Sequence, residues 1–314
     1  MQPASENNIV LVVRQTRLDG LIARFNTLEQ ARFYIEQGSG DFADYLAEHE
    51  RYQQAVTLAH RLLATLGRVH QLEREFLPNY LFGPGDLVVV VGQDGLVANT
   101  LKYLKGQRLI GINPDPQRWD GVLLPFKVRD LPRVVIETFA GRRPVREVTM
   151  AQARLDDGQT LYAVNDLFIG PRSHSSIRYR IETGGVAEEH SSSGVIVSTG
   201  LGSTGWLKSL LTGAQGIAAA LTGAPHPENF PPPATTPWDA PYLHFTVREP
   251  FPSRTSTTRQ LFGQVTAADP LILTSRLPEQ GVIFSDGIES DFLAFNAGTR
   301  AVIGVADKRG YLVG

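Results

Sequence analysis

Short apolar runs and longer amphipathic stretches alternate along the first 140 residues of the chain. The apolar runs lie at residues 9–13, 87–91 and 108–112. The run at 87–91 holds four consecutive valines, a pattern typical of a strand buried on both faces of a parallel sheet. Periodicity and capping residues predict helices over residues 27–38, 42–70 and 96–105. Strands that alternate with helices indicate an α/β domain with a Rossmann-like parallel sheet.

The pattern changes after the turn-forming sequence Gly141-Arg142-Arg143-Pro144. Short runs of alternating apolar and polar residues then predict strands over residues 145–155, 160–167, 176–183, 194–199, 244–247, 271–274 and 281–285. Turn residues separate these strands at close spacing, which favours antiparallel pairing in a β-rich, sandwich-like domain. One apolar helix is predicted over residues 204–221.

A proline-rich segment and a final strand determine the expected domain organisation. Residues 225–241 contain seven prolines and can form neither a helix nor a central strand. We predict a surface loop or lid there, with a disordered connector as the alternative. The final strand, over residues 301–305, is predicted to return to the first domain. The expected domains are an α/β domain over 1–142, a β-rich domain over 143–296 and a C-terminal segment over 297–314.

Composition and charge exclude several classes of partner and site. A formal net charge of −2 argues against nucleic acid or an anionic membrane surface as the main partner. The absence of cysteine excludes disulfides, thiolate catalysis and cysteine-bound metals, and the seven histidines show no metal-ligand spacing. We expect no secretory signal in the polar N-terminus, and no apolar run reaches the roughly 20 residues of a membrane helix. A cytoplasmic protein that binds small molecules is the expectation.

A polar turn follows the predicted central strand directly. Gly92, Gln93, Asp94 and Gly95 lie between this strand and the next helix. Ligands of open α/β sheets bind beyond the carboxyl ends of the strands, and glycines allow backbone N–H groups to approach an anion closely. Asp94 would then place a carboxylate where a phosphate-bearing substrate binds. The alternative is an ordinary strand-to-helix turn in which Asp94 caps the helix.

A glycine-rich stretch lies between the predicted strand at 194–199 and the apolar helix. Residues 200–205, Gly-Leu-Gly-Ser-Thr-Gly, match the G-x-G-x-x-G dinucleotide fingerprint. Two features argue against a Rossmann site: the stretch lies in a β-rich domain, and about 20 positions further on the prolines from Pro225 stand where a second parallel strand should end in an acidic residue. Ser203 and Thr204 can instead form a cradle for an anion with the N–H groups of a helix N-terminus. The alternative is plain capping of an ordinary helix.

Two further polar pairs follow predicted strands. Asn165 and Asp166 come after a strand over residues 160–164, where an amide beside a carboxylate can bind a ribose edge or a purine amino group. An Asx turn is the alternative for this pair. Asp286-Gly287 predicts a hairpin turn. No G-x-S-x-G elbow is present, since position 201 is leucine, so an esterase is disfavoured.

In their order and spacing these stretches resemble the NAD kinase family, which groups with the diacylglycerol and sphingosine kinases. The resemblance covers most of the chain and rests on four motifs. They are the loop at residues 92–96, Gly111-Ile112-Asn113, Asn165-Asp166 and the run over residues 193–206. Residues 13–17 and the long helix after them look most like the mitochondrial-type branch and its bacterial relatives.

The resemblance implies an NAD kinase/diacylglycerol kinase-like fold, with a nucleotide-binding α/β domain and a dinucleotide-binding β-rich domain. It implies transfer of the γ-phosphoryl of ATP to the 2′-hydroxyl of the NAD adenosine ribose, with Mg²⁺ as the metal. Asp94 would be the general base. The implied nucleotide-binding residues are Gly92, Gln93, Gly95, Asn113, Asn165, Asp166, Ser203, Thr204, Gly205, Trp206 and Ser209. No protein side chain is assigned to the metal, and family members are usually homodimers or homotetramers.

Five positions differ from the family's motifs. Gln93 replaces a glycine, Leu96 a threonine, Asp166 a glutamate, Ser193 an aspartate and Trp206 a tyrosine. The implied fold does not depend on these positions, whereas the substrate does. The alternatives are therefore a nucleotide-binding sensor of the same fold, a kinase of another hydroxyl acceptor, and a dinucleotide oxidoreductase that uses residues 200–205.

Overall fold

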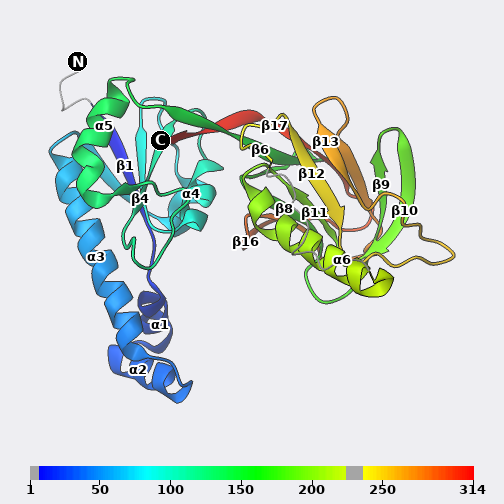
Figure 1. Cartoon of the computed structure of the whole chain (residues 1–314), viewed down its shortest axis with the longest axis horizontal. Coiled ribbons are helices and arrows are strands. Elements are labelled where there is room, and N and C mark those ends of the chain that lie inside the picture. Colours follow the sequence, from blue (N-terminus) through cyan, green and yellow to red (C-terminus); the bar gives the residue numbers. More distant parts are fainter. Residues whose placement is uncertain (1–6, 224–235) are drawn as a thin grey trace. The chain divides into compact units, whose positions relative to one another are not determined.

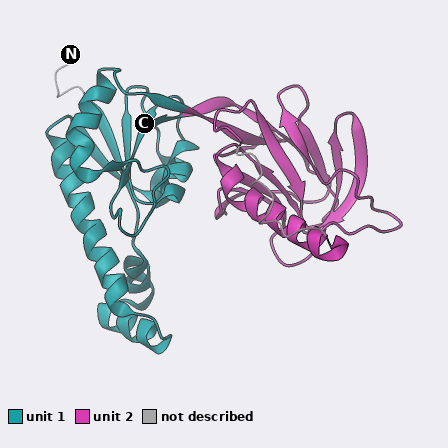
Figure 2. Ribbon diagram, viewed as in Figure 1, with its two compact units in different colours: residues 1–146, 311–314 teal, residues 147–310 magenta. Residues whose placement is uncertain are grey.

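Parallel and antiparallel strands fall largely into separate units of the chain (Figures 1 and 2). The computed structural model describes residues 7–223 and 236–314. Unit 1 comprises residues 1–146 and 311–314, and unit 2 comprises residues 147–310. Among the described residues, no helix is both long and apolar enough to cross a membrane. Residues 225–235 of the loop predicted over 225–241 lie outside the described part of the chain.

A parallel sheet forms the centre of unit 1. Its strands are β1 (Asn8–Val13), β2 (Arg68–Glu73), β3 (Leu87–Val91), β4 (Arg108–Asn113) and the short β5 (Phe126–Lys127). The main order is β2-β1-β3-β4, with every pair parallel. All five residues of β3 are buried, because helices cover both faces of the sheet. The apolar run at 87–91 is therefore the central strand that its valines predicted.

Five α-helices surround this sheet or extend from it. They are α1 (Arg17–Phe25), α2 (Leu28–Gln37), α3 (Phe42–Ala64), α4 (Asp94–Leu101) and α5 (Leu131–Phe139), with 3₁₀ turns η2 (Arg74–Asn79) and η3 (Val128–Asp130). The second half of α3 packs on the sheet through its apolar face. Its first half holds α1 and α2 in a small separate core, visible at the lower end of α3 in Figure 1.

The structure corrects two of the predicted helices and adds a third helix that was not predicted. The helix predicted over 42–70 ends at Ala64, because the chain turns at Gly67 into β2. A Cβ at Gly67 would lie 2.5 Å from the carbonyl oxygen of Asn7, so the position requires glycine. The helix predicted over 96–105 is α4, which begins at Asp94 and ends at Leu101. Helix α1 was not predicted, although Thr16 and Asp19 form a complete capping box at its start.

Unit 2 consists of two sheets that pack on a common apolar core. One is a six-stranded antiparallel sheet in the order β13-β12-β11-β8-β15-β16, and the other contains β6, β7, β9, β10, β14 and most of β17. The strands are β6 (Val145–Leu155), β7 (Thr160–Ala163), β8 (Asp166–Pro171), β9 (Ile177–Thr183), β10 (Val186–Ser192), β11 (Val195–Ser198), β12 (Tyr242–Val247), β13 (Phe262–Thr266), β14 (Leu271–Ser275), β15 (Gly281–Ser285), β16 (Ile288–Ala294) and β17 (Arg300–Val313). The fold class is therefore an α/β unit followed by an antiparallel β-rich unit.

Three further differences concern unit 2. The strand predicted over 160–167 is two strands, so Asp166 begins β8 instead of following the end of a strand. Strand β17 extends well beyond the predicted 301–305: it pairs with β14 and, at Tyr311 and Leu312, runs parallel to β4. The predicted helix at 204–221 is α6 (Trp206–Thr222), which follows a 3₁₀ turn, η4 (Gly202–Thr204).

Candidate functional site

The sheet order of unit 1 indicates where a ligand would bind. In the order β2-β1-β3-β4, the connection from β1 leads to β2 on one side, and the connection from β3 leads to β4 on the other side. The topological switch point therefore lies between β1 and β3. Ligands of open α/β folds bind beyond the carboxyl ends of the strands at this point. The segments that border it are residues 14–16 after β1 and residues 92–95 after β3.

Asp94 is the acidic residue of the segment after β3. It is the first residue of α4, half-buried, and its Oδ1 accepts a hydrogen bond of 2.7 Å from the backbone N–H of Leu123. The preceding Gln93 is the N-cap residue of α4 but makes no capping hydrogen bond through its side chain. The carboxylate is thus held at the N-terminal end of α4, where the N–H groups of the first turn favour a bound anion.

The neighbours of Asp94 have different roles in the loop. A Cβ at Gly92 would lie 2.8 Å from Cδ2 of Leu96, so Gly92 and Leu96 pack closely in the interior. Gly95 has nothing within 4 Å of such a Cβ and is exposed. The buried side chain of Asn113 donates to the carbonyl of Trp119 and accepts from the N–H of Asp115, which makes an Asx turn. Gly95 is therefore the glycine of this loop that lies open to a ligand.

The residues present fit a magnesium ion only as part of a metal–nucleotide complex. In the part of the chain that the structure describes, no three His, Asp or Glu side chains are grouped to hold a metal ion. Mg²⁺ in phosphoryl-transfer sites is usually held by one or two carboxylates together with substrate phosphates. A single carboxylate, Asp94, beside the N-terminus of a helix suits that arrangement.

In unit 2, a hairpin turn fixes the pair Asn165-Asp166. Asp286 and Gly287 both have positive φ, 53° and 73°, and connect β15 to β16 as the sequence predicted. The carboxylate of Asp286 accepts hydrogen bonds from the backbone N–H groups of Val164 and Asn165, at 3.1 and 2.6 Å. The N–H groups of Val164 and Asn165, between β7 and β8, thus bond to a side chain instead of to a neighbouring strand, which explains why the predicted single strand is interrupted there.

Asp166 has an unusual environment at the start of β8. It lies opposite Ser198 of β11, and its Oδ1 is buried without a hydrogen-bond partner among the described residues. Burial raises the pKa of the Asp166 carboxyl to about 7; the Ser198 hydroxyl lowers this pKa and the negative charge of Asp286 raises it. The carboxyl group can therefore be present in its neutral form at physiological pH and donate a hydrogen bond.

This environment predicts a pH dependence of stability. The pKa of Asp166 is about 7 in the folded protein and close to 3.8 in the unfolded chain, so the unfolded chain loses the proton first as pH rises. The stabilisation present below pH 4 is consequently lost between about pH 4 and pH 7. We expect Asp166→Asn to gain about 2 kcal/mol of unfolding free energy relative to wild type between pH 5 and pH 8. Urea unfolding of both proteins at pH 5 and at pH 8 measures this difference. An equal change in unfolding free energy between the two pH values for wild type and variant would contradict the prediction.

The glycine-rich stretch at 200–205 is not a Rossmann fingerprint. Strand β11, which precedes it, is antiparallel to both neighbours, β8 and β12, whereas the Rossmann motif requires a parallel strand. Its glycines serve close backbone packing: a Cβ would lie 1.8 Å from the carbonyl oxygen of Pro237 at Gly200, and 2.2 Å from that of Asn165 at Gly202. The hydroxyl of Ser203 donates to the carbonyl of Gly200 at 2.7 Å, within its own turn. Thr204 and Gly205 are exposed.

The close approach at Gly202 predicts a large loss of stability on substitution. The atom that a Cβ would meet belongs to the backbone of Asn165, which Asp286 holds in place, so the contact cannot relax cheaply. We expect Gly202→Ala to lower the unfolding free energy by about 2–3 kcal/mol. Gly213→Ala is the matched control, because Gly213 lies in α6 with open space at its Cβ and should gain up to about 1 kcal/mol. Similar midpoints in denaturant for the two variants would refute the clash.

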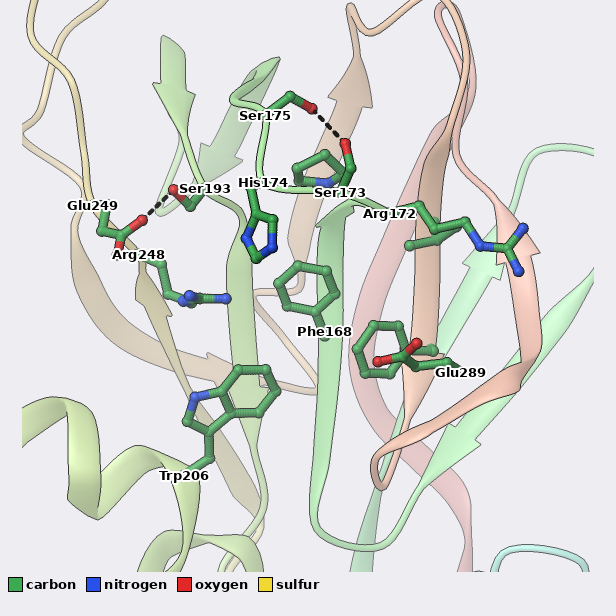
Figure 3. Close-up of a pocket in the computed structure, with 13 residues that line it drawn as sticks. Phe168, Arg172, Ser173, His174, Ser175, Ser193, Trp206, Arg248, Glu249 and Glu289 are labelled. Carbon is green, nitrogen blue, oxygen red and sulfur yellow. Dashed lines mark hydrogen bonds between the residues drawn. The ribbon is translucent and has the colours of Figure 1, made fainter. Parts of the chain in front are cut away.

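Trp206, the first residue of α6, lines a pocket of about 620 Å³ in unit 2 (Figure 3). Its indole stacks on the ring of Phe168, with centroids 5.8 Å apart and planes at 15°, and Phe168 in turn contacts Phe284 at 4.8 Å. The guanidinium carbon of Arg248 lies 5.6 Å from the Trp206 ring centroid. The pocket can therefore accept a flat aromatic group beside a positive charge.

The polar side of this pocket contains residues from the loops after β10 and β12. The hydroxyl of Ser193 donates to the carboxylate of Glu249, as Figure 3 shows. Two backbone hydrogen bonds, from Ser193 N–H to the carbonyl of Arg248 and from Arg248 N–H to the carbonyl of Gly194, hold the arginine in place. Arg172, Glu289 and the loop at 173–175 complete the polar part of the lining.

The structure therefore brings together only some of the residues that the sequence singled out. Gly92, Gln93, Asp94, Gly95 and Asn113 lie in unit 1, at the carboxyl edge of the parallel sheet. The others lie in unit 2, and of these Ser193 and Trp206 line the pocket, whereas the exposed Ser209 bonds back to the carbonyl of Gly205. The sequence did not indicate three of the pocket residues, Phe168, Phe284 and Arg248. Only Phe168 could have been suggested, because it lies two residues after Asp166 and therefore faces the same side of β8.

The fold is similar to those of solved structures, although the sequence itself has no match. No family model matches the sequence, and no curated protein matches it. The structure is similar to yeast NADH kinase in complex with NADH, with a TM-score of 0.57 and 14% identity, over 98% of this chain and 83% of that chain. It is also similar to an NAD kinase from Archaeoglobus fulgidus in complex with ATP, with a TM-score of 0.53 and 17% identity, over 98% and 93% of the chains. At such identities the likeness establishes the fold, and the chain has the fold of the NAD kinases.

Proposed function

We propose that the protein is an ATP-dependent phosphotransferase of NAD kinase type, which phosphorylates the 2′-hydroxyl of the NAD adenosine ribose. The observation that carries this proposal is the position of Asp94, at the carboxyl end of the central strand in a chain with the NAD kinase fold. The structural neighbours are complexes with NADH and with ATP, the two kinds of ligand that this reaction needs.

In the proposed reaction Asp94 acts as the general base. Its carboxylate takes the proton of the acceptor hydroxyl while that oxygen bonds to the γ-phosphorus and the bond to the β-phosphate oxygen breaks, which releases ADP. The hydrogen bond from Leu123 keeps the carboxylate in one orientation. Mg²⁺ bound to the ATP phosphates would neutralise their charge. The N–H groups at the start of α4, beside the exposed Gly95, would donate hydrogen bonds to phosphate oxygens.

Unit 2 is proposed to bind the dinucleotide. Trp206 and Phe168 offer a stacking surface for one of its rings, and Arg248 offers a positive charge to the groups attached to that ring. Asn165 and Asp166 would hold the adenosine, with the neutral carboxyl of Asp166 as a hydrogen-bond donor. From the resemblance of its motifs to the NAD kinase family, we also propose that the protein lies beside the mitochondrial-type branch and is a homodimer or homotetramer. We propose a cytoplasmic location from the cysteine-free composition.

A second candidate function is nucleotide binding without turnover, as a sensor. It is favoured by Gln93, which adds a side chain to the phosphate loop, and by Leu96, which fills the space over Gly92 and offers no hydroxyl. A kinase of another hydroxyl acceptor would use the same Asp94. An oxidoreductase is no longer supported, because residues 200–205 follow an antiparallel strand.

One assay tests the first proposal directly. Purified protein is incubated with ATP, Mg²⁺ and NAD, and NADP is measured with an NADP-specific dehydrogenase. Formation of NADP in proportion to enzyme supports NAD kinase activity. ATP and NAD binding in calorimetry without any product would support the sensor, and ADP release with another hydroxyl compound would support a different acceptor. Binding of neither nucleotide would contradict all three proposals.

A further inference from the structure

A buried phenol hydroxyl from α3 lies at the point where β1 and β3 separate. The Tyr52 side chain is 3% exposed, and its hydroxyl donates to the carbonyl oxygen of Val91 at 2.9 Å. The same hydroxyl accepts a hydrogen bond of 2.8 Å from the backbone N–H of Arg14. The parallel pairing of β1 and β3 extends to Val12 and Val90. Tyr52 therefore bridges the first backbone groups beyond the paired part of the two strands.

The two bridged groups are the starting points of both segments at the switch point. Val91 is followed at once by Gly92, Gln93 and Asp94, and Arg14 leads to the α1 capping residue Thr16. Burial raises the pKa of Tyr52 to about 12, so the hydroxyl keeps its proton and donates to Val91 throughout the physiological range. A single side chain thus joins the two segments at the switch point.

A second contact of α3 reinforces the same place. Glu48 lies one turn before Tyr52 on the same face of the helix, and its buried carboxylate pairs with Nη2 of Arg14 at 3.0 Å and with Nε of Arg17. The guanidinium of Arg14 also lies over the Tyr52 ring, 4.9 Å from its centroid. The segment after β1 is therefore held to α3 through both its backbone and its side chains.

We propose that Tyr52 is a positioning residue for Asp94: its hydroxyl sets the separation of the carboxyl ends of β1 and β3, and with it the placement of the loop at residues 92–95. Without the hydroxyl, the N–H of Arg14 and the carbonyl of Val91 are left without their shared partner in a buried site. Unpaired, these groups no longer hold the ends of β1 and β3 at a fixed separation, so both segments open more often and Asp94 loses its fixed placement. The catalytic part of this inference rests on the proposed kinase function, whereas the structural part does not.

Tyr52→Phe removes this one oxygen atom, and Tyr179→Phe is the matched control. Tyr179 is 1% exposed and its hydroxyl bonds to Oγ of Ser192 at 3.0 Å in unit 2, so both variants lose a buried hydroxyl hydrogen bond. Amide hydrogen exchange of the nucleotide-free protein is the first readout. We expect peptides covering residues 14–17 and 91–95 to exchange at least about tenfold faster in Tyr52→Phe and to be unchanged in Tyr179→Phe.

The second readout is NADP formation at a temperature where both variants are folded. We expect Tyr52→Phe to lower kcat at least about tenfold with the KM for NAD nearly unchanged, because a shift of Asp94 disturbs the reacting geometry more than ring binding in unit 2. A merely structural role would lower the melting temperature of both variants and leave kcat unaffected. Unchanged exchange at 14–17 and 91–95 would overturn the inference.

The two proposals fail in distinguishable ways. If wild-type protein forms no NADP, the kinase proposal fails and the exchange data alone decide the role of Tyr52. If Tyr52→Phe does not fold, the wild-type protein decides it by residue-resolved exchange in nuclear magnetic resonance. If the Arg14 amide exchanges as slowly as the amides inside β1, the hydrogen bond to the Tyr52 hydroxyl is supported. An Arg14 amide that exchanges as fast as those of exposed loops overturns it.

Discussion

Replacing Asp94 by asparagine should leave the protein folded and nearly abolish the proposed phosphoryl transfer. We expect kcat for NADP formation to fall by about 10²–10⁴-fold, the usual contribution of general base catalysis. The amide oxygen of asparagine can still accept the 2.7 Å hydrogen bond from the Leu123 N–H, so the loop stays anchored. The amide cannot take the proton of the acceptor hydroxyl. The initial rate of NADP formation and the melting temperature are measured on the same preparations.

Asp94→Ala is the comparison that separates the two roles of this side chain. Alanine removes the base and also leaves the N–H of Leu123 without its acceptor, so it should lower the melting temperature as well as the rate. If asparagine and alanine were equally destabilising, the anchoring role would be wrong. Retention of a tenth or more of the wild-type rate by Asp94→Asn would mean that another group takes the proton.

The fold was predictable where burial on both faces leaves only apolar residues. The bounds of β3 were found from Leu87–Val91 alone, because every position in a central parallel strand faces a covering helix. Edge strands carry no such signal: β10, β13 and β16 end their sheets, and their sequences mix polar and apolar residues without regular alternation. The end of α3 was missed because the need for glycine at Gly67 comes from Asn7, about 60 residues earlier in the chain.

The candidate site shows the same division between local and non-local information. The sequence indicates Asp94, since a carboxylate between glycines after a buried strand is a local pattern. It does not indicate Tyr52, whose hydroxyl meets Arg14 and Val91 only after α3 has packed on the sheet. Nor does it indicate Arg248 beside Trp206, because that contact depends on the pairing of β11 with β12.

Loss of the Trp206 indole should weaken dinucleotide binding strongly. Stacking of a base on an aromatic side chain contributes about 1–3 kcal/mol, so we expect the Kd for NAD to rise by about 10- to 100-fold in Trp206→Ala. The rate at saturating NAD should change little, because Asp94 lies in the other unit and is not altered. Calorimetric titration with NAD measures the affinity, and the kinase assay at high NAD measures the rate.

Trp206→Phe separates stacking from the packing of α6. The indole also contacts Phe168 in the small core under α6, so truncation to alanine disturbs that core as well as the pocket. Phenylalanine keeps an aromatic face over Phe168 and near Arg248, and it should recover most of the affinity that alanine loses. If phenylalanine restores the melting temperature but not the affinity, the indole N–H or its larger ring contacts the ligand. If both variants bind NAD as wild type does, the ring of the dinucleotide does not occupy this pocket.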